Sequence, residues 1–155
     1  VIIHFVMGIV LELQNNRARA YKYKKYNGGA NASWVSRNMI LTGLVVLAFL
    51  GLHMYDFWVH EMAYKYIEAN PEDPTRYYSE TVEKFEPFWR TVLYVISFVL
   101  LALHLWHGFA SSFQSMGINN KYSAAIQSFT KIYAVAIPLG FIFIALYHHL
   151  NPITH

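Results

Sequence analysis

Residues 94–108 read YVISFVLLALHLWHG, a nearly unbroken apolar run that contains His104. Such a run predicts a helix that crosses a lipid bilayer, because a span takes ~20 mainly apolar residues. Two further apolar runs carry embedded histidines, VIIHFVMGIVL at residues 1–11 with His4 and LVVLAFLGLHMYDFW at residues 44–58 with His53. Imidazole is costly in hydrocarbon unless something holds it, so each of these histidines is a functional-site hypothesis.

The composition predicts an all-α membrane protein. Of the 155 residues, 55% are hydrophobic, 17% aromatic and 14% charged, and the mean hydropathy is +0.26. In lipid the backbone must close its hydrogen bonds internally, which favours a transmembrane helix bundle. The absence of cysteine excludes disulfides, iron–sulfur ligation and thiolate catalysis in this chain. The net charge of +3 does not indicate nucleic-acid binding, because the basic residues are concentrated in one loop between apolar runs.

Four apolar segments are expected within one transmembrane domain that covers residues 1–155. The first, residues 1–14, is shorter than a span and has no polar flank before it, so we expect it to be the later part of a helix that starts upstream. Complete transmembrane helices are expected at residues 38–59, 87–116 and 127–150. Ser36 suits an N-cap, Gly117 a helix C-terminus and Pro138 a kink.

The loops predict the orientation of these helices. The loop at residues 15–37 carries six basic residues, the last of them Arg37, and no acid, so we expect it to be cytoplasmic. The loop at residues 60–86 carries seven acids against three basic residues and should face outward.

Orientation converts sequence position into depth. His4 and His104 each lie roughly 15–20 Å of helix from the predicted cytoplasmic face, at ~1.5 Å per residue, so they share a level. His53 lies about 20 Å along a helix that starts at that face and belongs nearer the outside. Haem iron is the partner that best fits three such imidazoles. We expect one haem b between His4 and His104 and a second held by His53.

A short motif recurs at the first level. His4 and His104 are each followed by a glycine at i+4, Gly8 and Gly108, on the same helical face. A glycine there removes a side chain where a flat macrocycle must approach the backbone. His107 is the alternative ligand to His104, or else a hydrogen-bond partner for a propionate, a quinone or a carbonyl.

Plainer interpretations stay open for all of these residues. The embedded histidines could be polar contacts between helices. Asp56 and Arg90, with Tyr55, Trp58 and Trp89, mark either an outer aromatic belt or a quinone headgroup site. Arg37 and Lys121 could neutralise haem propionates or only reflect the positive-inside bias. Four remaining histidines are expected to be solvated at helix ends and to need no partner: His60, His148, His149 and His155.

The sequence resembles the cytochrome b subunit of succinate dehydrogenase, in the two-haem, cytochrome b558-type form shared with some fumarate reductases, and is most similar to the version found in Bacteroidota. The resemblance covers essentially the whole chain. It rests on H-x-x-x-G followed by NNRARAYKYKKY at residues 15–26, on SWVSRNMILTG at residues 33–43 leading to LGLHMYDFW at residues 50–58, and on ALHLWHGFASSFQSMGINNKY at residues 102–122.

This resemblance implies five transmembrane helices in a bacterial inner membrane, with haem-ligating histidines on the first four. The segments of this chain correspond to helices two through five. His4 and His104 would then ligate the haem nearer the cytoplasm, and His53 the outer, periplasmic haem together with a histidine of the first helix, which is missing from this sequence.

The resemblance also implies the reaction. A flavoprotein subunit would oxidise succinate in the tricarboxylic acid cycle, and an iron–sulfur subunit would relay the electrons. This subunit would pass them through two b haems to a quinone, with menaquinone expected. The alternatives are the dihaem cytochrome b anchor of another respiratory dehydrogenase, or a haem-free membrane transporter or anchor.

Overall fold

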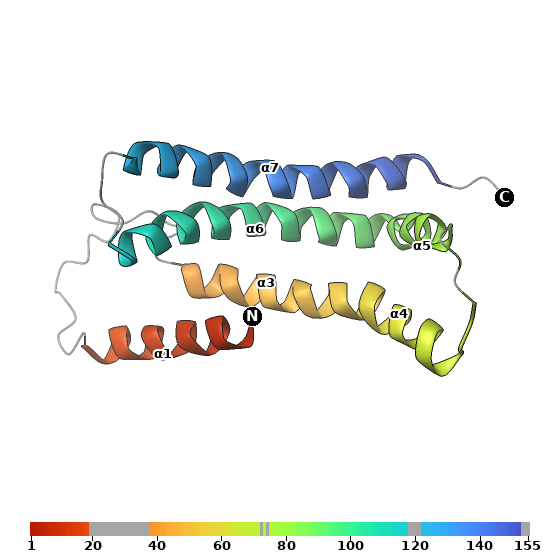
Figure 1. The fold of residues 1–155 in the computed structure, drawn as a ribbon, viewed down its shortest axis with the longest axis horizontal. Helices are drawn as coiled ribbons and strands as arrows, with labels where there is room; N and C mark the ends of the chain where they lie inside the picture. The colour runs from red at the N-terminus through yellow and green to blue at the C-terminus, as the bar shows by residue number, and fades with distance from the viewer. Residues whose placement is uncertain (19–37, 72, 74, 118–121, 153–155) are drawn as a thin grey trace.

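A computed structural model of the protein describes residues 1–18, 38–71, 73, 75–117 and 122–152. These residues are almost entirely helical, and long helices lie side by side along one direction (Figure 1). The described part of the chain contains no strand. The predicted all-α class is therefore confirmed.

The first two helical segments differ from their predicted lengths. Helix α1 spans Ile2–Ala18, four residues beyond the expected end. Helix α3 spans Met39–His53 and continues without a break through η2 (Met54–Val59), α4 (His60–Met62) and η3 (Ala63–Ile67). The expected end at residue 59 is wrong because HEMAYKYI favours helix: Glu61 and Lys65 form an i,i+4 ion pair of 2.7 Å.

The predicted outer loop contains a helix of its own. Helix α5 spans Arg76–Phe85, where the sequence analysis expected only a connection. Its buried apolar residues, Val82 and Phe85, lie three positions apart and therefore on one face. This stretch is strongly amphipathic, so its periodicity was an available signal for a helix that the sequence analysis missed.

Two long helices complete the bundle. Helix α6 spans Phe88–Ser115 and helix α7 spans Ser123–Leu150. Gly117 has φ +71°, which confirms the predicted left-handed residue after α6. Pro138 lies inside α7, and the helix continues through it.

Within the described part of the chain, three helices are long and apolar enough to cross a membrane. They are Met39–Ile67, Phe88–Phe113 and Ser123–Leu150, with 29, 26 and 28 residues. Their mean hydropathies of 1.8 to 2.0 come with large exposed apolar side chains on their outer faces. The chain thus has the character of a membrane-embedded, multi-pass protein.

The helices pack in the order α7, α6, α3, α1 (Figure 1). We call the end where α1 and α6 finish and where α3 and α7 begin the basic end, because the basic segment 19–37 connects α1 to α3 there. We call the opposite end, which carries η3 and α5, the acidic end. A cluster of buried hydrophobic residues lies toward the acidic end, where Tyr94 and Phe98 pack with Phe85 and Ala145.

Candidate functional site

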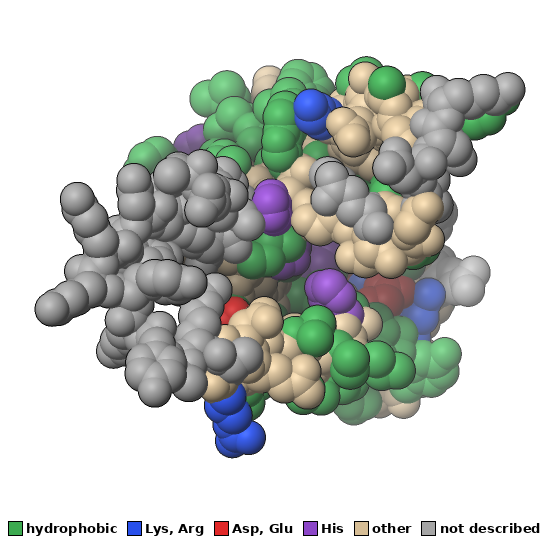
Figure 2. Space-filling view, turned by 90° about the vertical axis from the view of Figure 1, so that its left-hand side faces the viewer, with side chains coloured by type: hydrophobic (Ala, Val, Ile, Leu, Met, Phe, Trp, Pro, Cys, Tyr) green, Lys and Arg blue, Asp and Glu red, His purple; other side chains and the backbone are tan. Residues whose placement is uncertain are grey.

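The structure brings His4 and His104 together. Their ring centroids are 6.4 Å apart, and the two ring planes are perpendicular. His4 comes from α1 and His104 from α6, so the pair joins elements separated by 100 positions in the chain. Figure 2 looks onto the basic end and shows histidine side chains between the hydrophobic ones. The level that the sequence assigned to both residues is the same in the structure.

Helix α3 supports the His104 ring from the other side. The ring nitrogen Nδ1 lies 3.1 Å from the hydroxyl oxygen of Thr42. That hydroxyl in turn donates to the carbonyl oxygen of Met39 at 2.9 Å. Gly43 leaves room for the ring, because a Cβ there would lie 3.3 Å from Cε1 of His104.

The two glycines of the repeated motif have different surroundings. A Cβ at Gly8 would meet no atom within 4 Å, so one face of α1 is open beside His4. A Cβ at Gly108 would lie 3.0 Å from the terminal methyl of Met39. Gly108 therefore allows a flexible side chain of α3 to approach α6. Of these two glycines, Gly8 is the one with free space where a Cβ would lie.

Two other residues assigned to this site are not brought to the histidine pair. His107 is half-buried on α6, and among the described residues it has no hydrogen bond or ring contact. Arg37, like Ser36, Lys121 and His155, lies outside the described residues.

His53 lies at a separate level. It is eleven residues after Thr42 in the same continuous helix, which places it about 16 Å further toward the acidic end. Its ring contacts aromatic neighbours, with centroids 5.0 Å from Phe57, 5.9 Å from Phe49 and 6.2 Å from Tyr94. More than a third of the residue is exposed, and in the described part of the chain no second histidine ring touches it.

A buried ion pair lies one turn beyond His53. Asp56 is 2% exposed, and its carboxylate accepts the Tyr94 hydroxyl at 2.9 Å and faces an Arg90 guanidinium nitrogen at 3.2 Å. Arg90 and Tyr94 are four residues apart on α6, so both reach Asp56 from one helical face. The sequence placed Asp56 and Arg90 at a membrane boundary but gave no sign that they pair.

The aromatic residues beside this pair have a different position. Tyr55, Trp58 and Trp89 are between half and two-thirds exposed, on the outside of the bundle. The Trp89 ring lies beside Arg90, with its centroid 5.1 Å from the guanidinium carbon. Their exposure fits an aromatic belt, whereas Tyr94 is an aromatic residue whose hydroxyl reaches Asp56.

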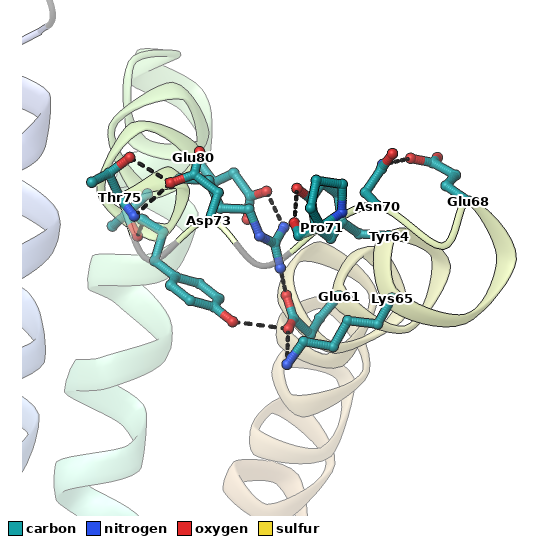
Figure 3. A network of polar contacts seen from close by, with 12 residues as sticks. Glu61, Tyr64, Lys65, Glu68, Asn70, Pro71, Asp73, Thr75 and Glu80 are labelled. Carbon is teal, nitrogen blue, oxygen red and sulfur yellow. Dashed lines mark hydrogen bonds and ion pairs between the residues drawn. The ribbon is translucent and has the colours of Figure 1, made fainter.

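A polar network holds the acidic end together (Figure 3). Arg76 of α5 forms ion pairs with Glu61 and with Glu80, and its guanidinium carbon lies 3.7 Å from the ring centroid of Tyr64. Glu61 also accepts the Tyr77 hydroxyl at 2.9 Å. The network fixes α5 across the end of the long α3–η3 helix. Most of its members are only partly buried, and nothing in their arrangement indicates a reacting group.

Two histidines that were expected to be solvated are partly enclosed. Nδ1 of His149 lies 2.9 Å from the carbonyl oxygen of Phe85, which also accepts the Thr91 hydroxyl at 2.7 Å. The His148 ring packs edge-on against Tyr78 of α5. The expectation that these imidazoles need no partner is wrong, because α5 folds back over the end of α7. His60 is exposed, as expected.

The donor chemistry of the His4–His104 pair suits one kind of metal centre. No three His, Asp or Glu side chains gather as a metal-binding group within the described ranges, whereas a structural zinc site takes four protein ligands. Haem iron needs only axial ligands. His4 and His104 would be the two protein ligands of such an iron, and their ring centroids lie 6.4 Å apart.

Comparisons of the chain with protein families, with curated proteins and with solved structures find no significant match.

Proposed function

We propose that this chain is the cytochrome b membrane subunit of a succinate:quinone oxidoreductase. In this proposal it carries electrons from an iron–sulfur subunit to a quinone, with menaquinone expected, and a flavoprotein subunit oxidises succinate. The observation that carries the proposal is the approach of His4 and His104 to 6.4 Å in a bundle of membrane-length helices. The residues quoted above for the family resemblance supply the finer assignment to succinate and to the bacterial inner membrane.

The chain's own residues have defined roles in this proposal. His4 and His104 would hold one haem b through their neutral ring nitrogens, and His53 would hold a second haem nearer the acidic end. When bound, haem b supplies reversible one-electron transfer. Apolar side chains around the half-buried His104 ring lower the local dielectric, which would tune the reduction potential of a haem held there. Gly8 leaves open the face of α1 beside its histidine.

A reduced-minus-oxidised spectrum of the intact membrane complex, with haem quantified per subunit, tests the proposal. We expect two b haems in the natural protein and the loss of one in His104→Ala. His107→Ala is the matched control, since it removes a neighbouring imidazole without a described contact, and it should keep both haems. A complex without haem, or one in which His104→Ala keeps both, would contradict the proposal.

Gly8→Ala gives a second, milder test. A methyl group at this position meets nothing within 4 Å in the protein alone, so the fold should tolerate it, and helix propensity favours it by about 1 kcal/mol. A macrocycle against this face would meet the methyl group, and haem content should fall. Gly140→Ala, whose Cβ is equally unobstructed on α7, should leave the haem content unchanged.

A haem-free membrane protein is the competing function. The observation that favours it is the contact of His104 with Thr42, because a hydrogen bond between helices is what a purely structural histidine would form. The spectrum described above separates the two, since a structural histidine leaves no haem band to lose.

A further inference from the structure

Thr42 is a hydroxyl residue in the apolar run of α3. The residue is 1% exposed and packs where α3 meets α6. Its hydroxyl oxygen lies within hydrogen-bond distance of two groups, the Met39 carbonyl at 2.9 Å and Nδ1 of His104 at 3.1 Å.

The position of the single hydroxyl hydrogen follows from these two contacts. A hydroxyl donates once and accepts through its lone pairs. If the hydrogen pointed at His104, two oxygens without a hydrogen between them would face each other at 2.9 Å, which is repulsive. The hydroxyl therefore donates to Met39, and Nδ1 of His104 must carry a hydrogen that it donates to Thr42.

This assignment fixes the state of the other ring nitrogen. In a neutral imidazole only one nitrogen carries hydrogen, so Nε2 of His104 bears the free lone pair. No hydrogen bond reaches Nε2 from any described residue. Gly43 strengthens the restraint, because a Cβ at this position would lie only 3.3 Å from Cε1 of the ring, so the ring is closely packed against α3.

We infer that Thr42 is a positioning residue that fixes the tautomer and the orientation of His104 so that Nε2 is presented as a metal ligand. The inference rests on the proposed haem-binding function. A hydroxyl oxygen that accepts the N–H of a metal-ligating imidazole raises the basicity of that imidazole. Its loss typically costs 10–100-fold in metal affinity or activity. A more basic ligand favours ferric iron, so Thr42 lowers the reduction potential of the haem that His104 holds.

The test is a redox titration of the intact membrane complex, in which the haem that disappears in His104→Ala identifies the relevant wave. In Thr42→Val, which keeps the shape and removes the acceptor, the ratio of reduced to oxidised haem at fixed ambient potential should rise about threefold to tenfold. Tenfold corresponds to about 59 mV for one electron. Thr42→Ser should titrate like the natural protein, and Thr42→Cys, a weaker acceptor, should lie between.

Thr130→Val is the matched control. Thr130 on α7 is 2% exposed, and its hydroxyl donates to the carbonyl three residues earlier at 2.9 Å, as that of Thr42 does, but among the described residues it has no hydrogen bond to a histidine. The control should leave both haem potentials unchanged.

The possible outcomes separate the two levels of the argument. An unchanged potential in Thr42→Val, an equal shift in Thr130→Val, or equal haem loss in Thr42→Ser and Thr42→Val would overturn the role of Thr42. If Thr42→Val does not accumulate in membranes, the haem potentials of Thr42→Cys and Thr42→Ser are compared instead. Equal potentials in these two variants would overturn the role of Thr42. Haem that survives in His104→Ala would instead overturn the proposed function itself.

Discussion

The two halves of the bundle hold their buried polar groups by opposite means. Toward the basic end, His104 is held by a neutral hydroxyl and faces another imidazole. Toward the acidic end, Asp56 is held by the charge of Arg90 and by the hydroxyl of Tyr94, a member of the buried hydrophobic cluster. The neutral hydrogen bond uses one ring nitrogen of His104 and leaves the other available for metal ligation. In the ion pair, the charged groups of Asp56 and Arg90 are used for each other. The half toward the basic end has the features of a ligand-binding site. The half toward the acidic end has those of a structural anchor, formed by Asp56, Arg90 and Tyr94.

The largest effect should come from removing the carboxylate of the anchor. Asp56→Ala leaves Arg90 without its partner beside the core, and breaking a buried ion pair typically costs about 3–5 kcal/mol. The free energy of unfolding in mixed micelles, measured by titration with a denaturing detergent, should fall by that amount.

Two further variants show whether the charge causes this loss. The double variant Asp56→Leu/Arg90→Met replaces the pair by apolar residues and should recover most of the stability. Glu12→Ala removes an exposed carboxylate whose partner among the described residues is Asn16, and it should change little. A loss in Asp56→Ala no larger than in Glu12→Ala would show that the acidic half needs no anchor.

A smaller effect is expected at the network of the acidic end. Arg76→Ala removes two ion pairs and the contact with the Tyr64 ring. Since hydrogen bonds to charged groups contribute about 1.5–3 kcal/mol where they are partly buried, we expect a loss of about 2 kcal/mol in the same unfolding measurement. Lys84→Ala, which removes a charge on α5 without a described partner, should stay within about 0.5 kcal/mol. Equal effects would mean that the network does not hold α5.

The Tyr94 hydroxyl tests the anchor more finely. Tyr94→Phe keeps the ring in the core and removes one hydrogen bond to a carboxylate, so the expected loss is about 1.5 kcal/mol. The comparison is Tyr133→Phe, whose hydroxyl has no hydrogen bond among the described residues and which should be neutral. If Arg90 alone satisfied Asp56, the two variants would unfold alike.

The smallest effect concerns the turn before α5. The pKa of Asp73 is lowered, first by the Thr75 hydroxyl and then by the Thr75 backbone N–H, which both donate to its carboxylate. Because the folded pKa is below the unfolded value, this contribution is complete above the unfolded pKa and is lost as pH falls through the folded one. Amide exchange at Thr75, corrected for its intrinsic rate, should therefore speed up on acidification. Asp73→Asn should remove most of this pH dependence.

The sequence predicted the parts of this structure that depend on apolar length and on depth. Run length identified the long apolar helices but not α5, and counting residues from the predicted membrane face placed His4 and His104 at one level. Depth is a position along the helix axis alone. A helix end that is misplaced by several residues therefore does not change which residues are assigned to the same level. The structure changed the end of the second helix by eight residues without disturbing this level.

The contacts that the sequence did not predict depend on helix rotation. Whether Thr42 faces His104, or Asp56 faces Arg90, depends on the angular position of each side chain around its helix. For Asp56 that angle is altered by the π-helical segment that begins directly after His53. A polar residue in an apolar run, at the depth of an embedded histidine, was the available signal for Thr42. It identifies a candidate partner but not its orientation.

The carbonyl of Phe85, which accepts both the Thr91 hydroxyl and a ring nitrogen of His149, has a consequence for biosynthesis. It ties the corner between α5 and α6 to the far end of α7, 64 residues later in the chain. A ribosome makes α3, α5 and α6 before it makes the end of α7. The hydrogen bond from His149 to that corner can therefore form only after the last described helix has entered the membrane. The acidic end is complete only when synthesis of α7 finishes.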